Sequence, residues 1–150
     1  MDLQQDVDLL RNIPLFRNID SRKLKLIAFT SQRLQFKANE NLFVQGDYGD
    51  SAFIIIEGEA SVLIYTNSDT QIEIAKVKKN DLVGEIAILC DVPRTATVRA
   101  KTELLTLEIT KEIFFQLVTQ FPEMALEVMR ELAFRLEKTN RRLQELTIKT

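Results

Sequence analysis

The hydrophobic positions of this chain follow a helical spacing near both ends and a strand spacing in the middle. In the first thirty residues, apolar side chains recur three or four positions apart, as on one face of a helix. They are Val7, Leu9, Leu10, Leu24, Ile27 and Ala28. Asn12-Ile13-Pro14 interrupts the first helix, and Asp20 or Ser21 can cap a second one that runs to about Phe29. We therefore expect two helices within residues 1–31.

From residue 32 the pattern changes to short apolar segments separated by polar turns. Residues 52–56 form an unbroken apolar, β-branched run, and Leu34 and Phe36 alternate with polar side chains. Val62 and Ile64 resume the two-residue spacing of a strand. Further strand-like segments lie at 42–44, 72–77, 97–100 and 104–109. Many short strands with turns between them are typical of a small barrel or a double sheet. This pattern predicts a β-rich unit over residues 32–109.

The last third of the chain returns to helical spacing. Thr110 can cap a helix over residues 111–119, and Pro122 suits the first position of the next helix. No glycine or proline follows Pro122, so that helix can continue almost to the end. We expect helices over 110–150, and a single domain over 1–150.

Composition excludes several classes of function. The 150 residues are 45% hydrophobic and 28% charged, which is typical of a soluble globular protein. The net charge of -2 argues against a broad nucleic-acid surface, so we expect no nucleic-acid contact. We expect no membrane segment because no apolar stretch is long enough, and no basic, apolar start resembles a secretory signal. We therefore expect a cytoplasmic protein.

Candidate catalytic chemistry is sparse. The chain has no histidine and one cysteine, Cys90. A usual zinc site, a disulfide, a Ser-His-Asp triad and a Cys-His nucleophile all need residues that it lacks. We therefore expect no enzyme, no catalytic residue, no metal site and no cofactor, and we expect Cys90 to be a buried packing residue.

Residues 82–98 carry the strongest signal. Gly84 allows close backbone approach, and residues 85–89 can form a short helix whose first N–H groups are free to bind an anion. Arg94 offers two parallel donors to phosphate oxygens. Thr95 and the N–H of Ala96 can complete the cradle.

Glu85 would repel a phosphate, but it suits a neutral donor on the same ligand. A ribose hydroxyl is such a donor. One acid, one arginine and free amides together fit a sugar-phosphate, although each feature alone is more often a turn or a surface charge.

The segment resembles the phosphate-binding cassette of the cyclic nucleotide-binding domain family, which includes catabolite activator protein and the regulatory subunit of protein kinase A. The family pattern is roughly Phe-Gly-Glu-(Leu/Ile)-Ala-x-Leu, three variable residues, then Pro-Arg-(Ala/Thr/Ser)-Ala-(Thr/Ser)-Val. The chain departs from it only at Val83, where an aromatic residue is usual. Upstream, residues 46–62 resemble the family's Gly-Asp signature, with turn and core residues rather than ligand contacts.

The resemblance implies a fold and a set of ligand contacts. The fold is α+β and mainly β: an eight-stranded β-roll, or jelly roll, flanked by N-terminal helices and a long C-terminal helix. Arg94 would pair with the cyclic phosphate, and Glu85 would accept from the ribose 2′-hydroxyl. The remaining contacts implied are Gly84, the amides of Ile86, Ala87 and Ala96, and the Thr95 hydroxyl. The ligand expected is cAMP, favoured over cGMP.

The final helix carries a seam at alternating steps of three and four. Its members are Met129, Leu132, Leu136, Thr139, Leu143 and Leu146. We expect Met129 and Leu132 to pack on the chain's own barrel, and the later members to meet a partner helix in a homodimer. This region also resembles the dimer helix of catabolite activator protein, which implies that Thr139 and Asn140 reach the adenine; equally, Thr139 can set the seam's register and Asn140 can be exposed.

Four functions follow as alternatives. The first is a sensor whose occupied cassette repositions the final helix. The second is the sensor domain of a transcription regulator whose DNA-binding part is absent from this chain. The third, a phosphodiesterase, is disfavoured by the missing histidine. The fourth, a structural dimer without ligand, is disfavoured by the intact Glu85 and Arg94.

Overall fold

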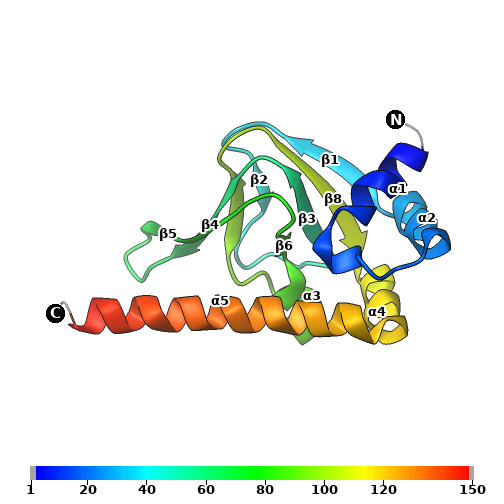
Figure 1. Cartoon of the computed structure of the whole chain (residues 1–150). Helices are drawn as coiled ribbons and strands as arrows, with labels where there is room; N and C mark the ends of the chain where they lie inside the picture. Colours follow the sequence, from blue (N-terminus) through cyan, green and yellow to red (C-terminus); the bar gives the residue numbers. More distant parts are fainter. Residues whose placement is uncertain (1–2, 149–150) are drawn as a thin grey trace.

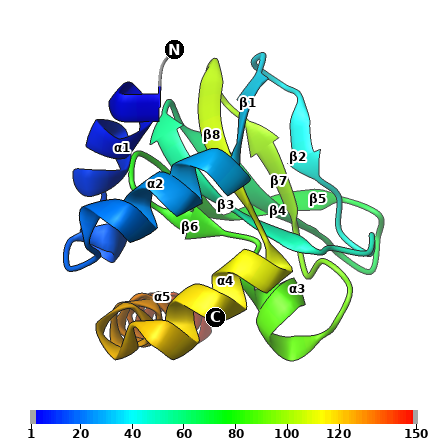
Figure 2. The same cartoon turned by 90° about the vertical axis from the view of Figure 1, so that its right-hand side faces the viewer.

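Two four-stranded antiparallel sheets form a roll, with helices at one end and along one side (Figures 1 and 2). The computed structural model describes residues 3–148. One sheet has the order β1-β8-β3-β6 and the other β2-β7-β4-β5. The strands are β1 (Gln32–Phe36), β2 (Asn41–Phe43), β3 (Ser51–Glu57), β4 (Ala60–Tyr65), β5 (Gln71–Val77), β6 (Leu82–Val83), β7 (Thr97–Ala100) and β8 (Leu104–Thr110).

Helices precede, interrupt and follow the roll. They are α1 (Leu3–Arg11), the 3-10 turn η1 (Pro14–Phe16), α2 (Ser21–Thr30), α3 (Glu85–Cys90), α4 (Lys111–Gln120) and α5 (Pro122–Ile148). Figure 1 shows α5 running along one side of the roll, past α3 and out along the side of the β4–β5 hairpin. The fold expected from the sequence is confirmed: eight strands in two sheets, with N-terminal helices and a long C-terminal helix.

The predicted helix starts have the expected chemistry. Asp20 caps α2, since its Oδ1 accepts from the Lys23 N–H at 3.0 Å. Thr110 caps α4 by accepting from the Ile113 N–H at 3.4 Å. Pro122 opens α5, where its missing N–H has no intrahelical role. These local signals place the helix boundaries correctly.

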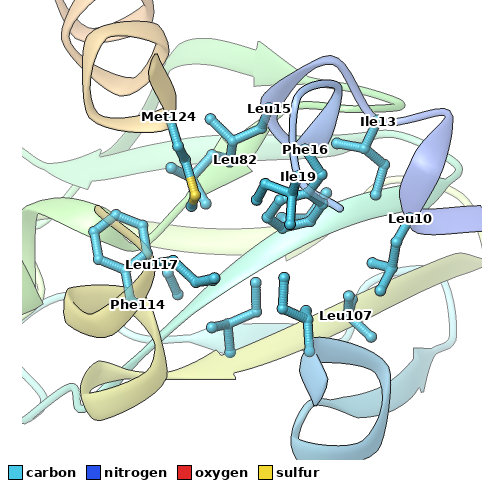
Figure 3. Packing of buried hydrophobic residues seen from close by; sticks show 14 of the residues in the cluster. Leu10, Ile13, Leu15, Phe16, Ile19, Leu82, Leu107, Phe114, Leu117 and Met124 are labelled. Atoms are coloured by element: carbon cyan, nitrogen blue, oxygen red, sulfur yellow. The ribbon is translucent and has the colours of Figure 1, made fainter. Parts of the chain in front are cut away.

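The apolar run of β3 is buried on both faces because the strand separates two cores. Ala52, Ile54 and Ile56 face the core between the β1-β8-β3-β6 sheet and the helices, shown in part in Figure 3. Phe53 and Ile55 face the core inside the roll. Successive side chains of a strand point to opposite faces, so β3 lacks the apolar–polar alternation of a half-exposed strand.

The N-terminal half of α5 packs on the domain, and the rest does not. Met124 and Val128 are buried in the helix-side core, and Leu132 packs against it, as expected. The prediction for Met129 is wrong, because it is 64% exposed. The inward stripe steps by four residues, and Met129 lies about 100° around the helix from Val128.

From Leu136 onward the apolar seam positions are exposed; these are Leu136, Leu143 and Leu146. No helix among the described residues is both long enough and apolar enough to cross a membrane.

Candidate functional site

The turn between β6 and α3 depends on a glycine. Gly84 has a φ of +83°, in the left-handed region that residues with a Cβ rarely adopt. A Cβ built there would lie 2.6 Å from Nη1 of Arg94 and 3.2 Å from Cε2 of Phe43. Gly84 therefore lets α3 turn sharply away from the sheet and brings its own backbone against Arg94.

Arg94 is a buried cation held by the main chain. Its Nη1 donates to the Gly84 carbonyl at 2.9 Å, and its Nη2 donates to the Ser51 carbonyl at 2.8 Å. The guanidinium carbon lies 4.1 Å from the centroid of the Phe43 ring. Only 5% of the residue is exposed, and Nε is buried without a hydrogen-bond partner. The side chain is thus fixed, with donor capacity that the protein does not use.

The loop before β3 holds the backbone of Arg94 from both sides. The Arg94 N–H donates to the Asp47 carbonyl, and the Gly46 N–H donates to the Arg94 carbonyl, each at 2.8 Å. Burial lowers the pKa of Arg94, while the nearby charges of Asp50 and Glu108 oppose that shift. A guanidinium remains protonated under such a perturbation, so the site keeps a positive charge.

Glu85 is buried beside this cation but turns its carboxylate to the long helix. Its Oε1 accepts from Nη1 of Arg135 in α5 at 2.9 Å. Arg135 also contacts Oε1 of Glu131 at 2.8 Å and the Leu82 carbonyl. Burial raises the pKa of Glu85, and the charges of Arg135 and Arg94 oppose the rise. The ion pair therefore ties α3 to α5 at the base of the cassette.

The raised pKa of Glu85 predicts a specific pH dependence of stability. Between its ordinary pKa of 4.5 and its higher folded value, the folded chain holds a proton that the unfolded chain has released. This carboxyl's contribution to the free energy of unfolding therefore falls as pH rises through that window. We expect Glu85→Gln to reduce this decrease in the free energy of unfolding between about pH 5 and about pH 7, measured by urea unfolding at both pH values.

Glu137→Gln is the matched control, because Glu137 is exposed on α5 and pairs with Arg141. An equal change of slope in both variants would contradict a special role for the buried carboxyl.

The other predicted cassette residues lie around these two charges. Ile86 and Thr95 are exposed, whereas Ala87 and Ala96 are buried. The Ala87 carbonyl accepts from the Asp91 and Val92 N–H groups, which ends α3 in a tight turn. The fold thus gathers Gly84, Glu85 and Arg94 at one place, with Thr95 at its solvent side.

Thr139 and Asn140 lie farther along α5. The Thr139 hydroxyl donates to the Arg135 carbonyl at 2.9 Å, one helical turn back. Both residues are exposed, and no hydrogen bond joins either of them to the cassette within residues 3–148. Two other residues of α5 reach the cassette: Arg135 contacts Glu85 and the Leu82 carbonyl, and Glu131 accepts from the Leu82 N–H at 3.3 Å.

Sequence reasoning missed four residues of this site. Arg135 pairs with Glu85, and the Ser51 carbonyl accepts from Arg94. Phe43 lies against the Arg94 guanidinium. A Cβ on Gly49 would lie 2.2 Å from Nε of Arg94. A weak signal existed for Arg135: Glu131 and Arg135 are an i, i+4 pair beside the inward-facing Leu132.

The expectation for Cys90 is wrong. The cysteine is exposed at the last position of α3. Ala87 and Ile88 lie on the buried side of α3. The chain leaves the helix at Asp91, whose backbone has the left-handed conformation. Cys90 therefore takes no part in the core. Within the described residues, no cluster of three or more potential metal ligands is present.

Comparison with known proteins settles the family. The profile described as "Cyclic nucleotide-binding domain" matches residues 33–121, which is more than half of the chain and includes the whole cassette. This chain belongs to the cyclic nucleotide-binding domain family.

A curated relative shares the sequence. The "cAMP-dependent protein kinase regulatory subunit" of Emericella nidulans is 30% identical over 109 residues, 73% of this chain and 26% of that protein. The chain thus spans about a quarter of that relative's length.

Two solved structures share the fold. The regulatory domain of Toxoplasma gondii protein kinase A, crystallised with cAMP, superposes with a TM-score of 0.75 at 21% identity, over 86% of this chain and 50% of that one. Thermus thermophilus catabolite activator protein gives a TM-score of 0.76 at 23% identity, over 89% of this chain and 63% of that one. Identities this low support the fold alone.

Proposed function

We propose that this domain senses a cyclic nucleotide, with cAMP preferred over cGMP, and that it carries out no chemistry of its own. Arg94 pairs with the cyclic phosphate and Glu85 accepts from the ribose 2′-hydroxyl. The amides of Ile86, Ala87 and Ala96 and the Thr95 hydroxyl line the same cradle. The observation that carries the proposal is the pair of buried, opposite charges beside Gly84: Glu85 follows it in the chain, and Arg94 donates to its carbonyl.

Binding requires both charges to exchange partners. Arg94 now donates to two carbonyls, and Glu85 is paired with Arg135. A phosphate offers Arg94 anionic acceptors in place of neutral carbonyls, and two parallel bonds to phosphate oxygens suit the geometry of the guanidinium. A ribose hydroxyl competes with Arg135 for the Glu85 carboxylate. Ligand entry therefore disturbs the contact between α3 and α5.

This exchange gives a route from the ligand to the long helix. Glu131 of α5 accepts from the Leu82 N–H at 3.3 Å. The second tie between α5 and the cassette is the Arg135 guanidinium, which is held by Glu85, Glu131 and the Leu82 carbonyl. When Glu85 turns to the ribose, that tie loosens and the helix shifts its preferred position. The ligand thus biases a two-state equilibrium through its different contacts in the two states.

A titration tests the proposal. Isothermal titration of the full chain with cAMP, cGMP and 5′-AMP should give the tightest binding for cAMP. The acyclic 5′-AMP, with the same base and sugar and an additional negative charge, should bind at least tenfold more weakly. Absence of binding by both cyclic nucleotides would overturn the proposal, whereas tighter binding of cGMP would overturn only the preference for adenine. Hydrogen exchange along α5, with and without cAMP, should change near Arg135 if the helix responds.

We also propose that the exposed seam of α5 pairs two copies of this chain. Leu136, Leu143 and Leu146 are each more than half exposed and follow heptad spacing, which suits a helix with the same pattern. We expect Leu143→Glu to lower the sedimentation mass to that of a monomer. Phe134→Ser is the control, because Phe134 is 57% exposed on α5 but outside the seam. A wild-type monomer, or dissociation by the control alone, would contradict this pairing.

A further inference from the structure

The aromatic ring of Phe43 lies against the charged group of the cassette, although Phe43 is 51 positions away from Arg94 in sequence. Phe43 is the last residue of β2 and packs, partly buried, against the core inside the roll. The Arg94 guanidinium carbon is 4.1 Å from its centroid. Its Cε2 atom is also close to Gly84, where a Cβ would approach it to 3.2 Å. One ring therefore touches both the cation and the turn that starts α3.

The ring and the hydrogen bonds restrain different motions of Arg94. The two carbonyl acceptors, Gly84 and Ser51, engage the edge of the guanidinium through Nη1 and Nη2. The ring, by contrast, faces the delocalised cation, an arrangement favoured by the ring quadrupole. When a ligand draws Nη1 or Nη2 toward its own oxygens, those edge contacts are exchanged. The contact with Phe43 does not use any N–H donor, so it can persist in both states.

Phe43 also accounts for the unusual residue at position 83. Val83 is the register partner of Phe53, and the Phe53 ring lies 5.9 Å from the Phe43 ring. Val83 and Phe53 both belong to the core inside the roll, against which Phe43 packs. The aromatic surface beneath the cassette thus comes from β2 and β3, and the short β6 contributes only a small side chain.

We propose that Phe43 is a positioning residue for ligand binding: it fixes the plane of the Arg94 guanidinium so that its edge faces the phosphate. Only the alignment with the phosphate rests on the proposed function. The packing of the ring on Arg94 is a property of the free protein. A bidentate contact needs the guanidinium plane and the phosphate oxygens to be aligned, so loss of the ring should weaken binding without removing the charge.

The experiment compares Phe43→Leu, which removes the ring, with Phe43→Tyr, which keeps it. The control is Phe36→Leu, because Phe36 packs against the same core from β1 and has no aromatic contact with Arg94 among the described pairs. Thermal unfolding records the stability of all three variants. We expect the two leucine variants to lose stability to a similar extent.

Two readouts separate positioning from packing. In the free protein, the Nε–H resonance of Arg94, assigned through its absence in Arg94→Lys, should be shifted by the ring current; Phe43→Leu should abolish this shift, and Phe43→Tyr should keep it. In titrations with cAMP, Phe43→Leu should bind roughly three- to tenfold more weakly, while Phe43→Tyr and Phe36→Leu should bind like the wild type.

An unchanged Arg94 resonance in Phe43→Leu would overturn the inference, and so would equal losses of affinity in Phe43→Leu and Phe36→Leu. If the resonance responds as expected but the wild type binds neither cAMP nor cGMP, the ring's role in holding Arg94 is supported and the proposed function is contradicted.

Discussion

Replacing Arg94 by alanine is expected to weaken cAMP binding by about 2–5 kcal/mol, which is roughly thirtyfold to several thousandfold. The variant removes the buried cation that faces the phosphate in our proposal. It also leaves the Gly84 and Ser51 carbonyls without a donor that they have in the wild type. A moderate loss of stability should therefore accompany the loss of affinity, measured by urea unfolding beside isothermal titration.

Arg99→Ala is the matched control for this change. Arg99 lies five positions later, is partly buried in β7, and donates to Asn41 and Gln71 rather than to the cassette. Arg99→Ala removes the same formal charge from the strand that follows Arg94. The affinity of this variant for cAMP should stay within about twofold of the wild type. Equal losses in both variants would mean that net charge, and not the position of Arg94, controls binding.

Gly49→Ala should have the second largest effect, because its new methyl group meets the guanidinium directly. The added Cβ would lie 2.2 Å from Nε and 2.4 Å from the guanidinium carbon of Arg94. Gly49 is not among the residues with positive φ, so the expected cost comes from the clash with Arg94 and not from a left-handed backbone. We expect a stability loss of about 1–3 kcal/mol and a loss of cAMP affinity of roughly tenfold or more.

Two further variants isolate this clash. Gly58→Ala adds a methyl group at a φ of +95°, where it would lie 2.3 Å from the Glu103 carbonyl oxygen, so it strains a turn of the roll that has no described contact with Arg94. Its affinity should change little. In an Arg94→Ala background, Gly49→Ala should lose most of its effect on stability, because the side chain that it strikes is gone. Additive losses in that double variant would contradict the assignment.

Local chemistry made much of the fold predictable. Asp20, Thr110 and Pro122 mark helix starts through contacts that span only a few residues, so their roles can be read along the chain. Gly84 and Arg94 stand out only in combination, because a turn glycine, an acid and an arginine in one short segment together fit a sugar-phosphate. Their identification also depended on a family pattern, which composition and periodicity do not supply.

Contacts between distant segments were not predictable. Arg135 reaches Glu85 across 50 positions, and Phe43 of β2 reaches Arg94 in the segment between α3 and β7. Neither pairing leaves a periodic trace in the sequence. Met129 and Cys90 were misplaced for a related reason. Each lies within two positions of a buried residue of its helix, Val128 or Ile88, and only the packing of the helix decides which positions face inward.

The part of α5 beyond Arg135 amplifies a small movement of the helix at the cassette. About thirteen residues separate Arg135 from the helix end at Ile148, a rigid rod of about 20 Å. If the rod pivots at Arg135, a tilt of roughly ten degrees moves its tip by more than 3 Å. Displacement of the Arg135 guanidinium by a ribose hydroxyl would thus move the end of α5 by a distance comparable to the width of a side chain.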